Sequence, residues 1–207
     1  DRHNPIYYHF LHYLRIIPSK IKSIEDIPFL PIEFFKKHTL KTNDFKSETT
    51  FQSSGTTGNQ TSIHHVKNTD FYLKNCQEIF ESFYNPIEEY TVLALLPAYL
   101  ERQNSSLVLM AEDFIKKSKK QHSGFYLYNF EELKNTLEIC MSKNEKILLL
   151  GVTFALLDFA EQFPMKLKNT IVMETGGMKG RKKEMIREDV HTCLLYTSPS
   201  PRDGLLS

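Results

Sequence analysis

The stretch Tyr90-Thr91-Val92-Leu93-Ala94-Leu95-Leu96 decides the fold, because it is apolar at both sets of alternating positions and ends at Pro97. A strand with one face in water alternates apolar and polar residues, whereas a strand covered on both faces is apolar throughout. Residues 146–150 and 169–174 repeat the apolar pattern. Together the three stretches predict buried strands of one sheet, with helices packed on both of its faces.

Segments with helical spacing of their apolar residues alternate with these strands. The predicted helices cover residues 4–15, 69–83, 105–117, 130–142, 154–163 and 182–190. The buried face expected for the second of them consists of Phe71, Cys76, Ile79, Phe80 and Phe83. Because strands and helices alternate, the predicted fold class is α/β, layered around a largely parallel sheet.

The composition limits the class of function. The chain has 207 residues, a formal net charge of +1 and 41% hydrophobic residues, which is enough for a substantial core. There is no excess of basic residues, so we expect no nucleic-acid partner. No apolar run is long enough to cross a bilayer, and the three cysteines form no Cys-x-x-Cys pair. We therefore expect a chain that does not span a membrane, in a reducing, cytoplasmic compartment.

A loop rich in hydroxyls and glycine, Ser53-Ser54-Gly55-Thr56-Thr57-Gly58, lies between strands predicted at residues 49–51 and 63–66. Glycine lets the backbone approach a ligand closely and adopt positive φ, so such a loop can surround a phosphate with N–H groups and hydroxyls. The same composition is typical of an ordinary hairpin turn. The Gly-Lys-Ser/Thr sequence of the common P-loop is absent.

A second glycine-rich segment, Met173-Glu174-Thr175-Gly176-Gly177-Met178-Lys179-Gly180-Arg181, begins at the end of an apolar strand. Ligands of parallel α/β sheets bind at the carboxyl ends of the strands, so this segment is placed to meet a nucleotide. Gly176 and Gly177 would let a flat base or a phosphate approach the backbone. A glycine turn that merely reverses the chain is the alternative. Gly151, at the end of another predicted strand, is expected to open room for an acyl chain.

The two glycine-rich segments resemble one family. Residues 53–58 are similar to the phosphate-binding loop of adenylate-forming acyl ligases, and residues 174–188 resemble the acyl-protein synthetases of bacterial luminescence, the LuxE family. Segments within residues 27–36, 96–107 and 149–154 resemble that family as well. The resemblance implies a layered parallel-sheet N-terminal domain of an adenylate-forming ligase, incomplete, that uses ATP and Mg²⁺.

The resemblance also implies an activity for the intact parent enzyme. A carboxylic acid, a fatty acid in the luminescence enzymes, is activated to an acyl-adenylate and transferred to a protein thiol, with an acyl-acceptor protein or reductase as partner. The implied nucleotide-binding residues are Ser53, Ser54, Gly55, Thr56, Thr57, Gly58, Glu174, Gly176 and Gly177. No catalytic residue and no metal ligand is assigned, because the Tyr-Gly-x-Thr-Glu motif and the catalytic lysine of the C-terminal domain are not found in this sequence.

Two other functions fit the same segments. A phenylacetate-CoA-ligase-like enzyme would share the loop and use coenzyme A as acceptor. A non-enzymatic nucleotide-binding fragment is the alternative outside the enzymes, and this fragment itself is expected to be inactive.

The end of the sequence differs in character from the rest. From Cys193 to Asp203 the residues match, codon for codon, the translation of a transposase-type sequencing adapter. We therefore expect residues 1–192 to form a partial N-terminal adenylation domain, and residues 193–207 to be a disordered, adapter-derived tail.

Overall fold

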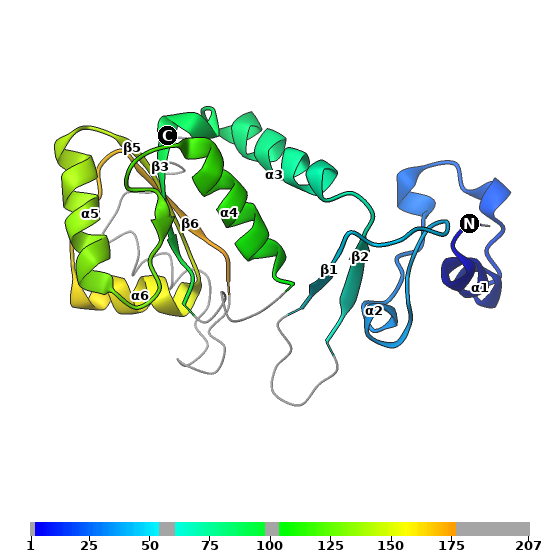
Figure 1. The fold of residues 1–207 in the computed structure, drawn as a ribbon. Helices are drawn as coiled ribbons and strands as arrows, with labels where there is room; N and C mark the ends of the chain where they lie inside the picture. Colours follow the sequence, from blue (N-terminus) through cyan, green and yellow to red (C-terminus); the bar gives the residue numbers. More distant parts are fainter. Residues whose placement is uncertain (1–2, 54–60, 98–103, 177–207) are drawn as a thin grey trace. The chain divides into compact units, whose positions relative to one another are not determined.

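The computed structural model describes residues 3–53, 61–97 and 104–176 (Figure 1). The described residues fall into two compact units. The first contains residues 3–53, 61–72 and 104–106, and the second contains residues 73–97 and 107–176. The helix predicted at residues 182–190 and the tail at residues 193–207 lie outside the described residues.

The second unit is built on a parallel sheet, as the sequence predicts. Its four strands lie in the order β4-β3-β5-β6, and every neighbouring pair is parallel. The strands are β3 (Tyr90–Leu95), β4 (Gly124–Phe125), β5 (Lys146–Gly151) and β6 (Thr170–Glu174). Every residue of β3 is buried, because both faces of this strand are covered.

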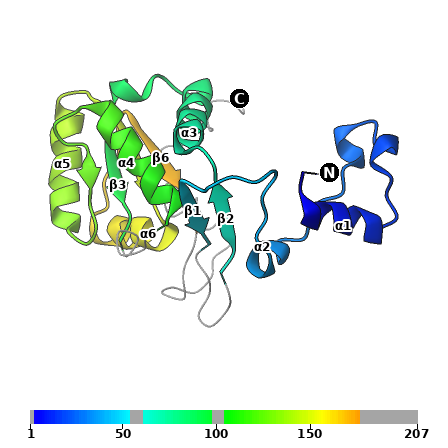
Figure 2. The same cartoon turned by 45° about the vertical axis from the view of Figure 1, so that its right-hand side comes forward.

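Helices cover both faces of the sheet (Figures 1 and 2). They are α3 (Thr69–Phe83), α4 (Ser106–Ser118), α5 (Phe130–Ser142) and α6 (Thr153–Gln162). A 3-10 turn, Ile87–Glu89, leads from α3 into β3. The chain therefore alternates strand and helix, which confirms the predicted layered α/β architecture.

The strand register divides the core into two parts. Leu93 lies beside Leu149, and Leu149 beside Val172, so these side chains share one face of the sheet. They pack with residues of α5 and α6, including Leu133, Leu137 and Phe159. The neighbouring row, Val92 and Leu148, points to the opposite face and packs with Phe80 of α3 and Phe114 of α4.

The buried face predicted for α3 is partly wrong. Phe80 is 5% exposed and Cys76 is half-buried. In contrast, Phe71, Ile79 and Phe83 are 68%, 62% and 78% exposed. The sheet contacts a narrower stripe of the helix than the apolar pattern suggests.

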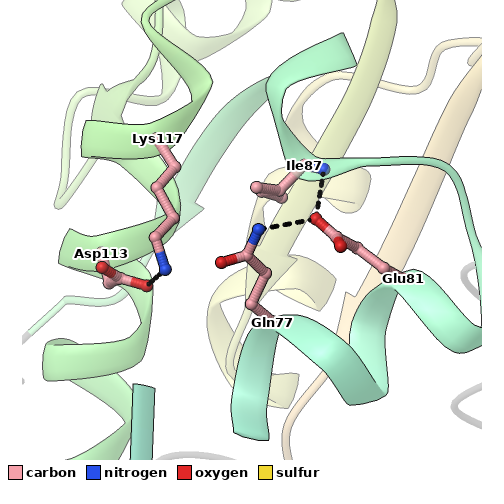
Figure 3. A network of polar contacts seen from close by, with 5 residues as sticks. All are labelled: Gln77, Glu81, Ile87, Asp113 and Lys117. Carbon is pink, nitrogen blue, oxygen red and sulfur yellow. Dashed lines mark hydrogen bonds and ion pairs between the residues drawn. The ribbon is translucent and has the colours of Figure 1, made fainter. Parts of the chain in front are cut away.

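On the face of the sheet covered by α3 and α4, side-chain contacts form within α4 and between α3 and the turn that follows it (Figure 3). One carboxylate oxygen of Glu81 accepts from the Gln77 side-chain amide at 2.8 Å and from the Ile87 backbone N–H at 3.2 Å. On α4, Lys117 pairs with Asp113 at 2.7 Å. Glu81 therefore holds the turn that leads into β3, next to a fully buried Ile87.

Two serine hydroxyls, of the buried Ser118 and the half-buried Ser123, complete the hydrogen bonding of β3 beyond the two residues that pair with β4. The Ser118 hydroxyl donates to the Tyr90 carbonyl at 2.7 Å, and the Val92 N–H donates to the Ser123 hydroxyl oxygen at 2.9 Å. The two serine hydroxyls lie 2.7 Å apart. Buried backbone groups without partners are costly, so these serines stabilise the strand edge.

Two asparagines precede the parallel strands β5 and β6. Asn144 and Asn169 both have positive φ, at 56° and 50°, a conformation that asparagine adopts more readily than most residues. The Asn169 side-chain amide donates to the Asn144 side-chain oxygen at 2.5 Å. The two chain turns are thereby joined before the strands begin.

The first unit contains short elements and one hairpin. Its elements are α1 (Pro5–Tyr13), two 3-10 turns (Pro18–Lys20 and Ile24–Asp26), α2 (Phe34–Lys37), β1 (Thr49–Gln52) and β2 (Ile63–Val66). Asn4 caps α1 by accepting from the Tyr7 N–H at 3.1 Å. β1 and β2 pair antiparallel, so the hydroxyl-rich loop connects the two strands of a hairpin.

Candidate functional site

The base of the predicted phosphate loop is closed by two serines of the first unit. The Ser53 N–H donates to the Ser62 carbonyl at 3.1 Å, and the Ser62 N–H donates to the Ser53 hydroxyl oxygen at 3.0 Å. Ser62 is 3% exposed, whereas Ser53 is exposed. A hydroxyl that accepts one hydrogen bond still carries its own hydrogen. Ser53 can therefore donate to an oxygen of a ligand while its accepting role holds the hairpin together.

Most of the predicted site residues of this loop are not described. Ser54, Gly55, Thr56, Thr57 and Gly58 lie outside the described residues. Gly177 of the second glycine-rich segment also lies outside them. The structure therefore places Ser53, Glu174 and Gly176 of the predicted set.

The two neighbouring histidines on β2 contact different groups, because adjacent residues of a strand point to opposite faces. The His64 ring stacks on Phe35 with centroids 4.6 Å apart, and its Nε2 lies 3.4 Å from the Ser62 hydroxyl. Nδ1 of His65 lies 3.1 Å from the Ser47 hydroxyl. Burial, together with the positive charge of Lys41, lowers the pKa of His65.

A separate candidate segment, in the second unit, lies at the carboxyl ends of β5 and β6. The Glu174 oxygen Oε1 accepts a hydrogen bond from the Gly176 N–H at 2.6 Å and another from the Thr153 hydroxyl. Thr175 donates twice to the Gly151 carbonyl, from its N–H at 3.0 Å and from its hydroxyl at 3.1 Å. The chain therefore leaves β6 in a turn fixed by three hydrogen bonds to the end of β5 and the start of α6, and by one within the turn itself.

The turn requires glycine at one position. Gly176 has φ +80°, in the left-handed region that side chains other than those of asparagine and aspartate disfavour. Among the described residues, no atom lies within 4 Å of a Cβ built on Gly176. The glycine is thus needed for its backbone conformation rather than to avoid a clash with a described neighbour.

The expectation that Gly151 opens room for an acyl chain is wrong. A Cβ on Gly151 would lie 2.7 Å from Cγ of Leu156, and Leu156 is 2% exposed. Leu156 therefore fills the space beside Gly151, and the lack of a side chain at Gly151 lets α6 pack closely on β5. A nearby cavity between α6 and the sheet, lined by residues such as Phe159, Phe163 and Val172, has a volume of about 20 Å³. It is far too small for a fatty chain.

Thr153 was not singled out by the sequence patterns. It is 4% exposed and starts α6, and the residue before it, Val152, makes no side-chain cap. The carboxylate of Glu174 brings negative charge to this helix start, where the helix dipole favours it. A threonine two residues after a buried strand, at the start of the next helix, is the signal that could have identified it.

Cys140 is buried and unsuited to accept an acyl group. Burial and the neighbouring Glu145 carboxylate raise the pKa of its thiol to about 11, and nucleophilic attack requires the thiolate. The Thr91 hydroxyl donates to Glu145 at 2.6 Å and lowers the pKa of that carboxyl group. This cluster lies where β3 and β5 begin, at the opposite ends of the strands from Glu174.

Within residues 3–53, 61–97 and 104–176, no group of three or more His, Cys, Asp or Glu side chains is arranged to hold a metal ion. No helix in the same residues is both long and apolar enough to cross a membrane.

Comparison with known proteins gives no relative. No protein-family model, no curated protein and no solved structure matches the chain.

Proposed function

We propose that the chain is part of the N-terminal domain of an AMP-forming acid–thiol ligase, of the acyl-protein synthetase type that its glycine-rich segments resemble. The parent enzyme would bind ATP and a carboxylic acid, a fatty acid being the substrate that the resemblance implies. The observation that carries the proposal is the Glu174–Gly176 turn at the carboxyl ends of β5 and β6. Parallel α/β sheets bind their ligands at this end of their strands.

The described contacts support a binding role for that turn. It is fixed before any ligand arrives, because Glu174 and Thr175 are held by Thr153 and Gly151. Among the described residues, both hydrogen bonds to the Glu174 carboxylate reach Oε1. Its Oε2 can accept hydrogen bonds from donors on a nucleoside, such as ribose hydroxyls. By resemblance, Gly176 and Gly177 would lie against the adenine.

The hairpin loop would provide the second part of the mechanism. By resemblance, residues 53–58 hold the β- and γ-phosphates of ATP with N–H groups and hydroxyls. The substrate carboxylate attacks the α-phosphorus, the bond to the bridging oxygen breaks, and pyrophosphate leaves with the electron pair. The protein positions the reactants and stabilises the charge on the departing phosphates. Mg²⁺ would be held largely by phosphate oxygens, which suits a site with few carboxylates.

The acceptor of the acyl group distinguishes the two enzyme candidates. In the acyl-protein synthetases it is a protein thiol, and in the phenylacetate-CoA-ligase-like enzymes it is coenzyme A. Cys140 does not fit the first role, because its thiol is fully buried and its pKa is about 11.

Nucleotide binding is tested by calorimetric titration of the chain with ATP and Mg²⁺. We expect saturable binding, lost in the Gly55→Asp, Gly58→Asp double variant because the added carboxylates repel phosphate. Gly124→Asp is the matched control, since a Cβ at Gly124 meets nothing within 4 Å. Equal heats for the chain and the loop variant would refute the phosphate-binding role.

Activity is tested on the parent enzyme by ATP–pyrophosphate exchange. Exchange that depends on a carboxylic acid supports the ligase, and its absence with a panel of fatty and aromatic acids favours a non-enzymatic binding module. Transfer of a labelled acyl group to protein or to coenzyme A then decides between the two acceptors.

A further inference from the structure

The contact between Thr153 and Glu174 joins two elements that meet at the candidate nucleotide site. Thr153 starts α6, and Glu174 ends β6. The Thr153 hydroxyl donates to the same oxygen of Glu174 that accepts from the Gly176 N–H. Thr153 is 4% exposed, so surrounding atoms restrict its side chain. It therefore fixes one donor for a carboxylate that would otherwise rotate about three side-chain bonds.

We propose that Thr153 is a positioning residue of the nucleoside part of the site, and that it acts by fixing the Glu174 carboxylate and, through it, the turn at Gly176. The inference rests on the proposed nucleotide binding and adds a residue to it. Thr153 does not touch the nucleotide. Its hydroxyl orients Oε1 of Glu174 toward the Gly176 N–H, which leaves Oε2 to accept from the ligand's hydroxyl groups.

The physical reason is the free-energy cost of ordering the Glu174 carboxylate and the Gly176 turn when a nucleotide binds. Without the threonine hydroxyl, Glu174 keeps a single donor at Oε1, the N–H of a glycine that is itself conformationally free. A nucleotide that binds would then have to order the carboxylate and the turn. Immobilising one flexible side chain corresponds to a loss in affinity of about three- to tenfold.

The substitution Thr153→Val removes the hydroxyl and keeps the shape, and Thr153→Ser keeps the hydroxyl. We expect Thr153→Val to weaken the binding of AMP and ATP about three- to tenfold, and Thr153→Ser to restore it to within about twofold. Pyrophosphate with Mg²⁺ is the second probe. It lacks the nucleoside, so its affinity should be the same for the chain and for both variants.

A purely structural role for Thr153 predicts a different result. Thr136→Val is the matched control, because Thr136 is also buried, at 6% exposed. Its hydroxyl oxygen accepts from Tyr126, which follows β4 at the opposite edge of the sheet from β6. We expect Thr136→Val to lower the unfolding temperature without changing the affinity for AMP. If the control weakens AMP binding as much as Thr153→Val does, loss of stability explains both and the positioning role is refuted.

The remaining outcomes separate the inference from the function on which it rests. Equal AMP affinity for the chain and for Thr153→Val would overturn the positioning role and leave nucleotide binding intact. Equal loss of AMP and pyrophosphate binding would overturn it as well, since the effect would not be confined to the nucleoside. If the unsubstituted chain binds neither AMP nor ATP, the proposed function fails and the inference fails with it.

Discussion

A methyl group at residue 151 tests how closely α6 is packed against the sheet. A Cβ on Gly151 would lie 2.7 Å from Cγ and 2.8 Å from Cδ2 of Leu156, well inside the separation of about 3.5–4.0 Å at which carbon atoms attract. Leu156 is 2% exposed, so its side chain cannot move into solvent. The substitution Gly151→Ala must therefore shift Leu156, and with it the start of α6.

The magnitude follows from two opposing effects. Overpacking a well-packed core costs about 1–3 kcal/mol, and replacing glycine by alanine recovers about 0.4–1 kcal/mol through the unfolded chain. We expect Gly151→Ala to lower the unfolding free energy by about 1–2 kcal/mol, the net of these two effects. Leu156→Ala alone should cost about 2–5 kcal/mol because it leaves a cavity.

The two substitutions together should not be additive. In the Leu156→Ala background the clash is absent and the new methyl occupies part of the cavity, so Gly151→Ala should be neutral or stabilising. The double-mutant cycle should therefore give a coupling energy of about 1–2 kcal/mol, within the range found for residues in contact. Urea unfolding followed by circular dichroism measures each variant, with Gly124→Ala as the control that meets no neighbour. Additive costs would show that Leu156 does not fill the space beside Gly151.

Three further predictions concern groups outside the candidate site. Thr91→Val should lower stability at neutral pH by about 1–3 kcal/mol. The Thr91 hydrogen bond holds the pKa of Glu145 below its ordinary 4.5, so the pH-dependent part of its stabilising effect is complete above pH 4.5 and is lost as the pH falls through the lowered pKa. Equal acid profiles of the variant and the parent chain would contradict this. Cys140, fully buried with a pKa of about 11, should resist alkylation at mildly alkaline pH until denaturant is added, as located by mass spectrometry. Ser118→Ala should cost about 1–3 kcal/mol because it removes the donor to the Tyr90 carbonyl, whereas the exposed Ser142→Ala should be nearly neutral in the same thermal unfolding assay.

Most of the secondary structure could be predicted because the signals were local. The continuous apolar stretches at residues 90–96 and 146–150 specify strands covered on both faces, and the structure contains them as adjacent parallel strands. Helix boundaries agree to within one or two residues at α3, α5 and α6. The helices were predictable from their apolar period, and the two strands from short apolar stretches that end at Pro97 and Gly151 and are too short for helices.

Features that depend on tertiary packing could not be predicted from the sequence. Phe71, Ile79 and Phe83 carry an apolar pattern, yet they are exposed, because the width of the contact between α3 and the sheet is decided by the shapes of both elements. Gly151 suggested open space, and only the packing of Leu156 shows that the space is filled. Of the candidate site, the position of Glu174 and Gly176 at the end of β6 was predictable from chain order. The hydrogen bond from Thr153 was not, since it depends on how α6 starts.

The hydrogen bond between Asn144 and Asn169, ahead of β5 and β6, has a consequence for the chemical stability of the protein on storage. Asparagine loses its side-chain amide slowly by deamidation, and the product is an aspartate. If Asn144 reacts, its oxygen can still accept from the Asn169 amide. If Asn169 reacts instead, the donor becomes a carboxylate that faces another acceptor oxygen. The same chemical lesion should therefore be tolerated at one turn and should separate the two turns when it occurs at the other.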